Sequence, residues 1–132
     1  MYKWLNFKCH IDPRGKLVPV EYEKDIPFKI KRLFWIYETD RDVLRGCHAH
    51  KKSKEVIVCL SGSCDFILDN GKERQIIHLS DPSKGLYLEP SVWREFTNFS
   101  ENCVLLVISN LSYKESDYIR DYKKFIKEMS ND

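Results

Sequence analysis

Apolar residues along most of the chain gather in short runs that end at turn-forming residues such as Ser61-Gly62-Ser63, Asn70-Gly71 and Pro90. A run of about four to eight residues rich in β-branched and aromatic side chains is typical of a strand. The runs fall at residues 4–11, 16–22, 29–38, 55–60, 65–68, 75–79, 85–89 and 102–109. About eight to ten short strands at such spacing predict an all-β sandwich or barrel.

Only the C-terminal end changes to a helical period. Ser112-Tyr113-Lys114-Glu115 matches a capping box, in which the serine and the glutamate each bond a backbone N–H at the start of a helix. Hydrophobic residues then recur at helical spacing: Tyr118, Ile119, Tyr122, Phe125, Ile126 and Met129. The sequence therefore predicts a terminal helix that covers one side of the sheet.

Length and composition fit one domain, residues 1–132, with 42% hydrophobic and 32% charged residues. Lys and Arg number 22 against 20 Asp and Glu, and a net charge of +2 argues against a general nucleic-acid binder. The longest apolar runs, 56–60 and 104–108, are far shorter than the roughly 20 residues of a membrane span. Five cysteines without a Cys-x-x-Cys pair favour reduced thiols and a cytoplasmic location.

The stretch Arg45-Gly46-Cys47-His48-Ala49-His50-Lys51 carries the most informative chemistry. Two histidines at i and i+2 on a strand point to the same face, about 7 Å apart at their Cα atoms. Such a pair can share a metal ion, or it can act as acid and base on adjacent atoms of a substrate. A hydrogen-bonded pair of surface histidines is the structural alternative. An ordinary pKa near 6.5 suits these side chains to acid–base work.

The spacing His48-x-His50-x4-Glu55 matches the first half of the cupin motif, whose two histidines and glutamate usually bind a metal. The second half normally supplies another histidine, but Arg94 stands at that position. A guanidinium offers no lone pair to a metal, and its charge repels a cation. We therefore expect a cupin-type jelly-roll barrel with a C-terminal α-helix. Metal is disfavoured there, although His48, His50 and Glu55 remain able to form a facial triad.

Further basic residues lie in or beside these motifs and indicate an anionic substrate. Arginine binds phosphate through two parallel charge-assisted hydrogen bonds. The candidate binding residues are Arg14, Arg32, Arg45, Lys51 and Arg94. A solvated surface charge is the alternative for any one of them, and the replacement of a ligand position makes Arg94 the strongest candidate.

The segments 30–37, 45–51, 59–64, 85–87, 92–95 and 117–122 together extend over nearly the whole chain. They resemble the WxcM-like family, and within it the dTDP-4-keto-6-deoxyglucose 3,4-ketoisomerases. The resemblance implies a metal-independent, homodimeric isomerase that needs no cofactor and acts on a dTDP-linked keto-deoxysugar. Its place would be bacterial deoxysugar synthesis for a surface glycan such as the lipopolysaccharide O-antigen. Some members carry histidine where this chain has Arg94, which leaves the C4 configuration of the product open.

Moving a ketone from C4 to C3 requires a proton to leave C3 and another to reach C4, through an enediol or enediolate. Two histidines on one face match this geometry. We expect His50 to be the leading general acid or base and His48 its partner, with the reverse assignment open. Arg45 or Arg94 would stabilise a negative enediolate. Tyr37 is a candidate donor to a sugar oxygen, with barrel packing as its alternative role.

Under the same resemblance, the diphosphate would bind Arg14, Arg32 or Lys51, and thymine would stack on an aromatic side chain that the sequence does not identify. Two other functions stay open: a metal-dependent cupin enzyme, and a non-catalytic module that binds a sugar nucleotide. The aromatic-rich segments 4–7 and 34–37 would leave exposed strand edges in so small a barrel. A two-fold dimer that pairs or exchanges N-terminal strands would cover them.

Overall fold

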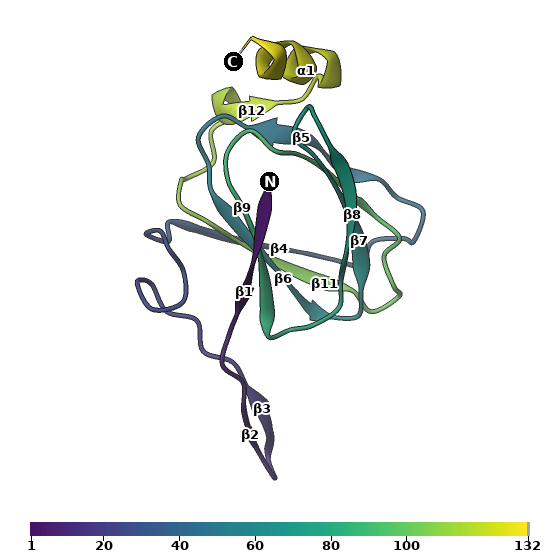
Figure 1. Cartoon of the computed structure of the whole chain (residues 1–132). Coiled ribbons are helices and arrows are strands. Elements are labelled where there is room, and N and C mark those ends of the chain that lie inside the picture. The colour runs from purple at the N-terminus through teal and green to yellow at the C-terminus, as the bar shows by residue number, and fades with distance from the viewer. Residues whose placement is uncertain (132) are drawn as a thin grey trace.

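Two five-stranded antiparallel sheets form the body of the protein in a computed structural model, which describes residues 1–131 (Figure 1). The first sheet has the order β1 (Tyr2–Asn6), β9 (Lys84–Leu88), β6 (Glu55–Ser61), β11 (Val104–Ser109) and β4 (Arg32–Tyr37). The second has the order β12 (Tyr118–Ile119), β5 (Arg45–His50), β10 (Trp93–Thr97), β7 (Cys64–Asp69) and β8 (Arg74–Leu79). The predicted all-β barrel with one C-terminal helix is confirmed.

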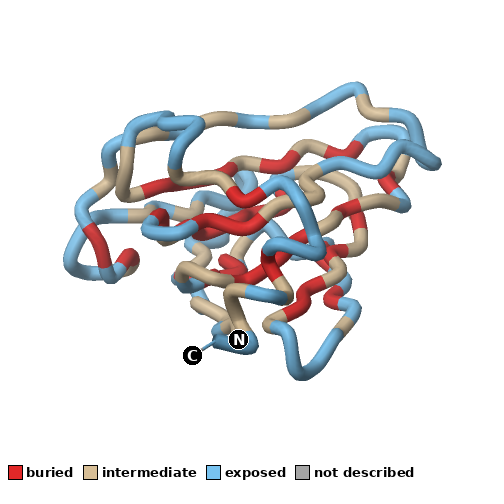
Figure 2. Tube along the Cα trace, turned by 90° about the horizontal axis from the view of Figure 1, so that it is seen from above, coloured by how far each residue is buried: buried red, intermediate tan, exposed pale blue. Residues whose placement is uncertain are grey.

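The sheets pack because their inward side chains are apolar. β4 alternates between half-buried and exposed positions, as a strand with one solvent face should, whereas the residues of β6 from Glu55 to Cys59 are all buried. The main core contains Ile57, Phe66 and Leu105, together with other inward residues of both sheets. Figure 2 shows these buried stretches along the strands and the exposed ones in the loops between them.

The C-terminal helix, α1 (Tyr122–Ser130), begins later than the sequence predicted. Its N-cap is Asp121, whose side chain accepts a hydrogen bond from the backbone N–H of Lys124 at 3.1 Å. The predicted capping box at 112–115 is wrong. Residues Glu115–Asp117 form a single 3₁₀ turn (η1), and the next two residues extend the second sheet as β12. Pairing with the edge of β5 satisfies backbone groups that a helix at this point would leave open.

Helix α1 covers one end of the barrel, above β5 and β12 (Figure 1). Phe125 is fully buried and packs with Ala49, Trp93 and Ile119 in a separate cluster; its ring centroid lies 5.8 Å from that of Trp93. The helix therefore closes the barrel above the strand that carries the two histidines. None of the helices in the described part of the chain has the length and apolar character to cross a membrane.

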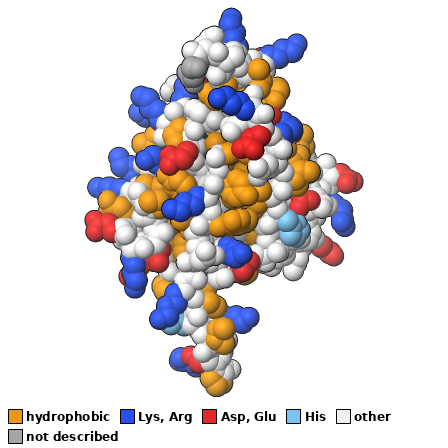
Figure 3. All heavy atoms as spheres, in the orientation of Figure 1, with side chains coloured by type: hydrophobic (Ala, Val, Ile, Leu, Met, Phe, Trp, Pro, Cys, Tyr) orange, Lys and Arg blue, Asp and Glu red, His pale blue; other side chains and the backbone are white. Residues whose placement is uncertain are grey.

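The N-terminal region departs from the barrel. The predicted strand at 4–11 is split into β1 and β2 (His10–Asp12), which forms a hairpin with β3 (Gly15–Leu17). The hairpin projects away from the body (Figures 1 and 3). Ile11 and Leu17 on it are 69% and 61% exposed, so the hairpin has little apolar packing within its own chain.

We expect Phe125→Ala to lower the free energy of unfolding by about 3–5 kcal/mol, because it removes a fully buried ring and leaves a cavity under the helix. Chemical denaturation measures this. The control is Ile76→Ala, a truncation at a position 71% exposed, which should change the stability by less than about 0.5 kcal/mol. Equal effects of the two substitutions would contradict the described packing of α1.

Candidate active site

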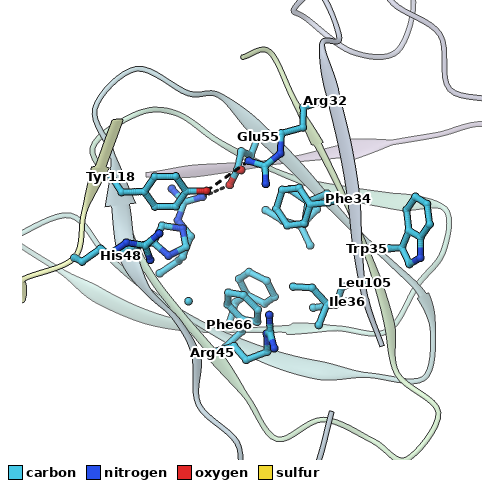
Figure 4. A pocket seen from close by; sticks show the side chains of 16 residues that line it. Arg32, Phe34, Trp35, Ile36, Arg45, His48, Glu55, Phe66, Leu105 and Tyr118 are labelled. Atoms are coloured by element: carbon cyan, nitrogen blue, oxygen red, sulfur yellow. Dashed lines mark hydrogen bonds and ion pairs between the residues drawn. The ribbon is translucent and has the colours of Figure 1, made fainter. Parts of the chain in front are cut away.

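A cavity of about 330 Å³ opens between the two sheets and is lined by residues of both (Figure 4). Its apolar wall consists of Phe34, Trp35, Ile36, Ile57, Phe66, Phe96, Leu105 and Val107. Its polar residues are Arg32, Arg45, His48, Glu55, Arg94, Tyr118 and Arg120. His48, Glu55 and Tyr118 lie together at one end in Figure 4, whereas Ile36, Phe66 and Leu105 form the opposite side.

A register shift between β5 and β10 positions His48 and Arg94. Arg94 pairs directly with His48, but the register then shifts so that Glu95 pairs with Gly46. Gly46 has a φ of +80°, and a Cβ atom there would lie 2.5 Å from the Phe96 ring, so this position requires glycine. The bulge ends beside His48, whose side chain faces the cavity next to that of its cross-strand partner.

Arg94 is buried in an ion pair that joins the two sheets. Its Nη1 donates to Oε1 of Glu55, on β6 of the first sheet, at 2.6 Å, and its Nη2 donates to the carbonyl of Val92 at 2.9 Å. Both side chains are at most 5% exposed. Burial lowers the pKa of Arg94 and the Glu55 carboxylate opposes this, and a guanidinium stays protonated at any physiological pH. A fixed positive charge therefore lies at the floor of the cavity.

This charge acts on the histidines. Burial lowers the pKa of His48 to about 3, and Arg94 adds to the effect, so the imidazole is neutral at neutral pH. The His48 and His50 rings are 4.9 Å apart in an edge-to-face arrangement, and the Tyr118 ring lies within 4.9 Å of both. The predicted placement of the two histidines side by side is confirmed.

His50 lies behind His48 and does not line the cavity. Its side chain is 2% exposed, and its Nδ1 contacts Oδ2 of Asp117 at 2.9 Å. Its Nε2 is 3.5 Å from Oε2 of Glu55, without the geometry of a hydrogen bond. Burial and Arg94 lower the pKa of His50, opposed by Glu55 and Asp117. The residue expected to lead the chemistry is thus the inner one, and His48 faces the cavity.

Arginines surround the mouth of the cavity. Nη1 of Arg32 is 3.5 Å from the hydroxyl of Tyr118, and its guanidinium stacks 4.4 Å from the centre of the Phe34 ring. Arg120 lies 4.2 Å above the Tyr118 ring and is paired with the exposed Glu115. These cations suit an anionic group at the entrance.

The structure brings only some of the expected binding residues together. Arg32, Arg45 and Arg94 line the cavity, as does His48. Three others lie elsewhere in the same chain. Tyr37 is 57% exposed and lies outside the cavity lining, because strand alternation turns it away from the inward-facing Ile36. Lys51 follows the end of β5 and lines a separate surface hollow, and Arg14 lies at the hairpin turn, paired with Asp12.

The sequence did not indicate Tyr118, Arg120 or Asp117 as site residues. All three follow Glu115 in the segment that was assigned to a helix. Their position depends on the pairing of Tyr118 with His50 and of Ile119 with Ala49. No short-range signal in the sequence specifies that pairing.

The donor set does not favour a metal ion. In the cupin comparison Glu55 would be a ligand, yet its Oε1 accepts from Arg94, and Oε2 faces the His50 ring. Among residues 1–131, no group of three or more His, Cys, Asp or Glu side chains has an arrangement that fits a metal. The buried cation beside Glu55 would also repel one.

The fold and site define a small β-barrel whose cavity is bordered by cations and lined by His48 beside the buried Arg94, with His50 one ring behind. The chain belongs to the FdtA family, described as WxcM-like, C-terminal, whose pattern matches residues 1–130.

Relatives of known activity support this assignment. The chain is 50% identical over 125 residues to the TDP-4-oxo-6-deoxy-α-D-glucose-3,4-oxoisomerase of Aneurinibacillus thermoaerophilus, covering 95% of this chain and 90% of that protein. The crystal structure of QdtA, a sugar 3,4-ketoisomerase of Thermoanaerobacterium thermosaccharolyticum in complex with TDP, has a TM-score of 0.97 at 46% identity, covering 98% and 95% of the two chains. WlaRA of Campylobacter jejuni, a TDP-fucose-3,4-ketoisomerase, has a TM-score of 0.93 at 39% identity, covering 98% and 96%.

Glu55→Gln should lower the free energy of unfolding by about 3–5 kcal/mol, because it leaves the Arg94 charge buried without its counter-charge. The double variant Glu55→Gln/Arg94→Met should recover most of this loss, since it removes the unpaired charge. Urea denaturation of the wild type and both variants measures the effect. A single variant as stable as the wild type would show that the pair does not hold the sheets together.

Proposed function

We propose that the protein is a metal-independent 3,4-ketoisomerase that converts dTDP-4-keto-6-deoxyglucose to a dTDP-3-keto-6-deoxyhexose. The observation that carries the proposal is the neutral His48 facing the cavity directly beside the buried cation Arg94. Membership of the WxcM-like family and 50% identity to a 3,4-oxoisomerase support the same reaction.

The cavity and its entrance suggest how the substrate binds. About 330 Å³ lies at the small end of the range of roughly 300–1,000 Å³ for ligand pockets, so the sugar end fits inside and the nucleotide extends outward. Its diphosphate would meet Arg32, Arg45 and Arg120 at the mouth. Trp35 is 61% exposed and lies on the same outward face of β4 as Leu33 and Tyr37, so it is not a candidate for stacking on thymine inside the cavity.

The chemistry is a proton transfer between adjacent carbons. A neutral His48 can accept the proton that leaves C3, and the same imidazole, once protonated and exchanged with solvent, can return a proton to C4. The hydroxyl proton of C3 passes to the oxygen of C4, so that the ketone moves with no net gain or loss of protons. Negative charge on the enediolate oxygen would be stabilised by Arg94 at the floor of the cavity. His50 lies one ring further in and would exchange protons with the His48 side of the site. In this proposal His48 takes the leading role that the sequence had assigned to His50.

Three of the candidates expected from the sequence lie outside the cavity of the single chain. Arg14 is on the projecting hairpin, so it can meet a diphosphate only if that hairpin reaches a second copy of the protein. Lys51 and Tyr37 lie outside the cavity and are retained only as outer contacts to the nucleotide.

The reaction can be followed directly. Purified protein incubated with dTDP-4-keto-6-deoxyglucose in D₂O should give the 3-keto product with deuterium at C4, observed by NMR. His48→Asn keeps the approximate size of the side chain and removes the base, and should lower kcat by about 10²-fold or more without loss of thermal stability. Unchanged turnover in His48→Asn would overturn the proposed role.

Two controls separate the alternative functions. Treatment with EDTA should leave the rate unchanged, whereas loss of activity that returns with added divalent metal would establish a metal-dependent cupin enzyme instead. A binding module would bind the dTDP-sugar without isomerisation or deuterium exchange.

We also propose that the protein is a homodimer, with the second copy covering the apolar surface of the edge strand β4. Leu33 and Tyr37 are 54% and 57% exposed there, and Ile11 and Leu17 on the projecting hairpin offer a further apolar surface. Exposed β edges of this kind favour pairing with another chain. An exchange of N-terminal hairpins between two-fold-related copies would bury both surfaces.

Light scattering at micromolar concentration should give the mass of two 15.7 kDa chains. Leu33→Glu should shift the protein toward the monomer, because it introduces a charge into the contact. Ile76→Glu, which changes an equally apolar and more exposed residue on β8, should not. A monomeric wild type, or a dimer that is indifferent to Leu33→Glu, would contradict the proposed contact.

We also propose a cytoplasmic location and a role in the synthesis of a surface glycan. All five cysteines are free, three of them buried, which is in keeping with a reducing compartment and a cytoplasmic location. The product would serve bacterial deoxysugar synthesis for a surface glycan such as the lipopolysaccharide O-antigen.

A further inference from the structure

Asp117 is a partly buried carboxylate that contacts the inner histidine; it does not line the cavity, and it lies instead in the surface hollow that Lys51 also lines. Its side chain is 9% exposed and lies in the 3₁₀ turn η1, immediately before β12. Three donors surround it. Oδ1 accepts from the backbone N–H of Lys52 at 2.7 Å, and Oδ2 accepts from the hydroxyl of Ser53 at 2.5 Å and contacts Nδ1 of His50 at 2.9 Å.

These contacts fix the protonation state of the carboxyl group. Burial alone raises the pKa of Asp117, but the hydrogen bonds from Ser53, Lys52 and His50 outweigh it and hold the pKa below its ordinary value. The side chain is therefore an ionised group that can only accept hydrogen bonds. An acceptor 2.9 Å from Nδ1 requires the proton of His50 to lie on that nitrogen.

The other ring nitrogen of His50, Nε2, then carries no proton. Nε2 has no hydrogen-bond partner among residues 1–131, and Oε2 of Glu55 lies 3.5 Å from it. A proton that reaches Nε2 would give an imidazolium with a carboxylate beside each nitrogen: Glu55 at Nε2 and Asp117 at Nδ1. This arrangement favours proton uptake by His50 in surroundings where burial and Arg94 oppose it.

We propose that Asp117 is a positioning residue for the isomerisation, which holds His50 as the Nδ1–H tautomer with Nε2 ready to accept a proton. The inference rests on the proposed ketoisomerase function. In the reaction the proton on Nδ1 stays in place. The proton taken up by Nε2 comes from the His48 side of the site and returns there, so no proton is gained or lost over the cycle.

Asp117→Asn tests the assignment with almost no change in shape. The asparagine oxygen would still accept the hydrogen bond from the backbone N–H of Lys52. The asparagine NH₂ group would then point toward Nδ1 of His50 and donate to it, so the proton of His50 would lie on Nε2 instead. We expect kcat for dTDP-4-keto-6-deoxyglucose to fall by about 10²-fold, with KM changed less than about threefold. Imidazole ¹⁵N NMR should show the Nδ1–H tautomer of His50 in the wild type and the Nε2–H tautomer in the variant.

The pH profile gives a further readout. The titratable and charged groups that face His50 are Asp117, Glu55, Arg94, His48 and Tyr118. Loss of one carboxylate removes a group that favours protonated His50, so its pKa falls further. Any limb of the kcat profile that His50 governs should move to lower pH in Asp117→Asn.

The chain contains a matched control. His78 and Asp65 form the same Nδ1-to-carboxylate contact at 2.7 Å on the exposed hairpin of β7 and β8, with the His78 side chain 59% exposed. Asp65→Asn should leave kcat, KM and the His50 tautomer unchanged. An equal loss of kcat in both variants would show a general structural effect and overturn the proposal.

The imidazole ¹⁵N spectrum of the wild-type protein can by itself refute the proposed role of Asp117. An Nε2–H tautomer of His50 in the wild-type spectrum would overturn the assignment even if Asp117→Asn fails to fold, and so would normal turnover in a folded variant. A wild type that shows the Nδ1–H tautomer but no isomerisation would refute the proposed function instead, and would leave the tautomer assignment standing.

Discussion

The buried ion pair between Arg94 and Glu55 is the interaction on which the rest of the site depends. It joins β10 of one sheet to β6 of the other inside the barrel, at 2.6 Å and with almost no exposure to solvent. Two charges in such a place require each other, since either one alone would be strongly destabilising. Glu55 occupies the position at which a metal-binding cupin has a glutamate ligand. In this chain it pairs with Arg94 and neutralises that buried charge instead.

The same cation separates the roles of the two histidines. It lies across the ladder from His48 and lowers the pKa of both imidazoles, so that neutral rings are the resting state. His48 faces the cavity, and among residues 1–131 no carboxylate is hydrogen-bonded to it. His50 faces inward, between Glu55 and Asp117. Two residues of one type, two positions apart on one strand, thus have different surroundings. In the proposed reaction His48 would meet the substrate while His50 holds a proton.

Much of this follows from local sequence patterns. Short apolar runs predict the strands, and the i, i+2 spacing of His48 and His50 predicts that their rings lie on one face. The arginine at a ligand position is the basis for proposing a site without metal. The patterns failed where distant segments meet. The serine and glutamate at 112 and 115 satisfy the local rule for a helix start, yet pairing with the edge of β5 outweighs it, and Asp121 caps the helix instead. Asp117 therefore could not be assigned from local sequence, because only that pairing brings it to His50.

The position of the charges also explains how binding and chemistry can be divided within one small cavity. At the floor, Arg94 is neutralised in large part by Glu55, so it contributes a directed field over a short range and little net charge. At the mouth, Arg32 and Arg45 have no ion-pair partner within residues 1–131, and the partner of Arg120 is the exposed Glu115. A dianionic diphosphate gains most from the unpaired cations at the mouth, whereas an enediolate oxygen, which is charged only during the reaction, gains from the buried donor below. In the proposed reaction this arrangement would direct affinity to the nucleotide and transition-state stabilisation to the sugar, which is the division that a catalyst needs if it is not to bind its substrate too tightly.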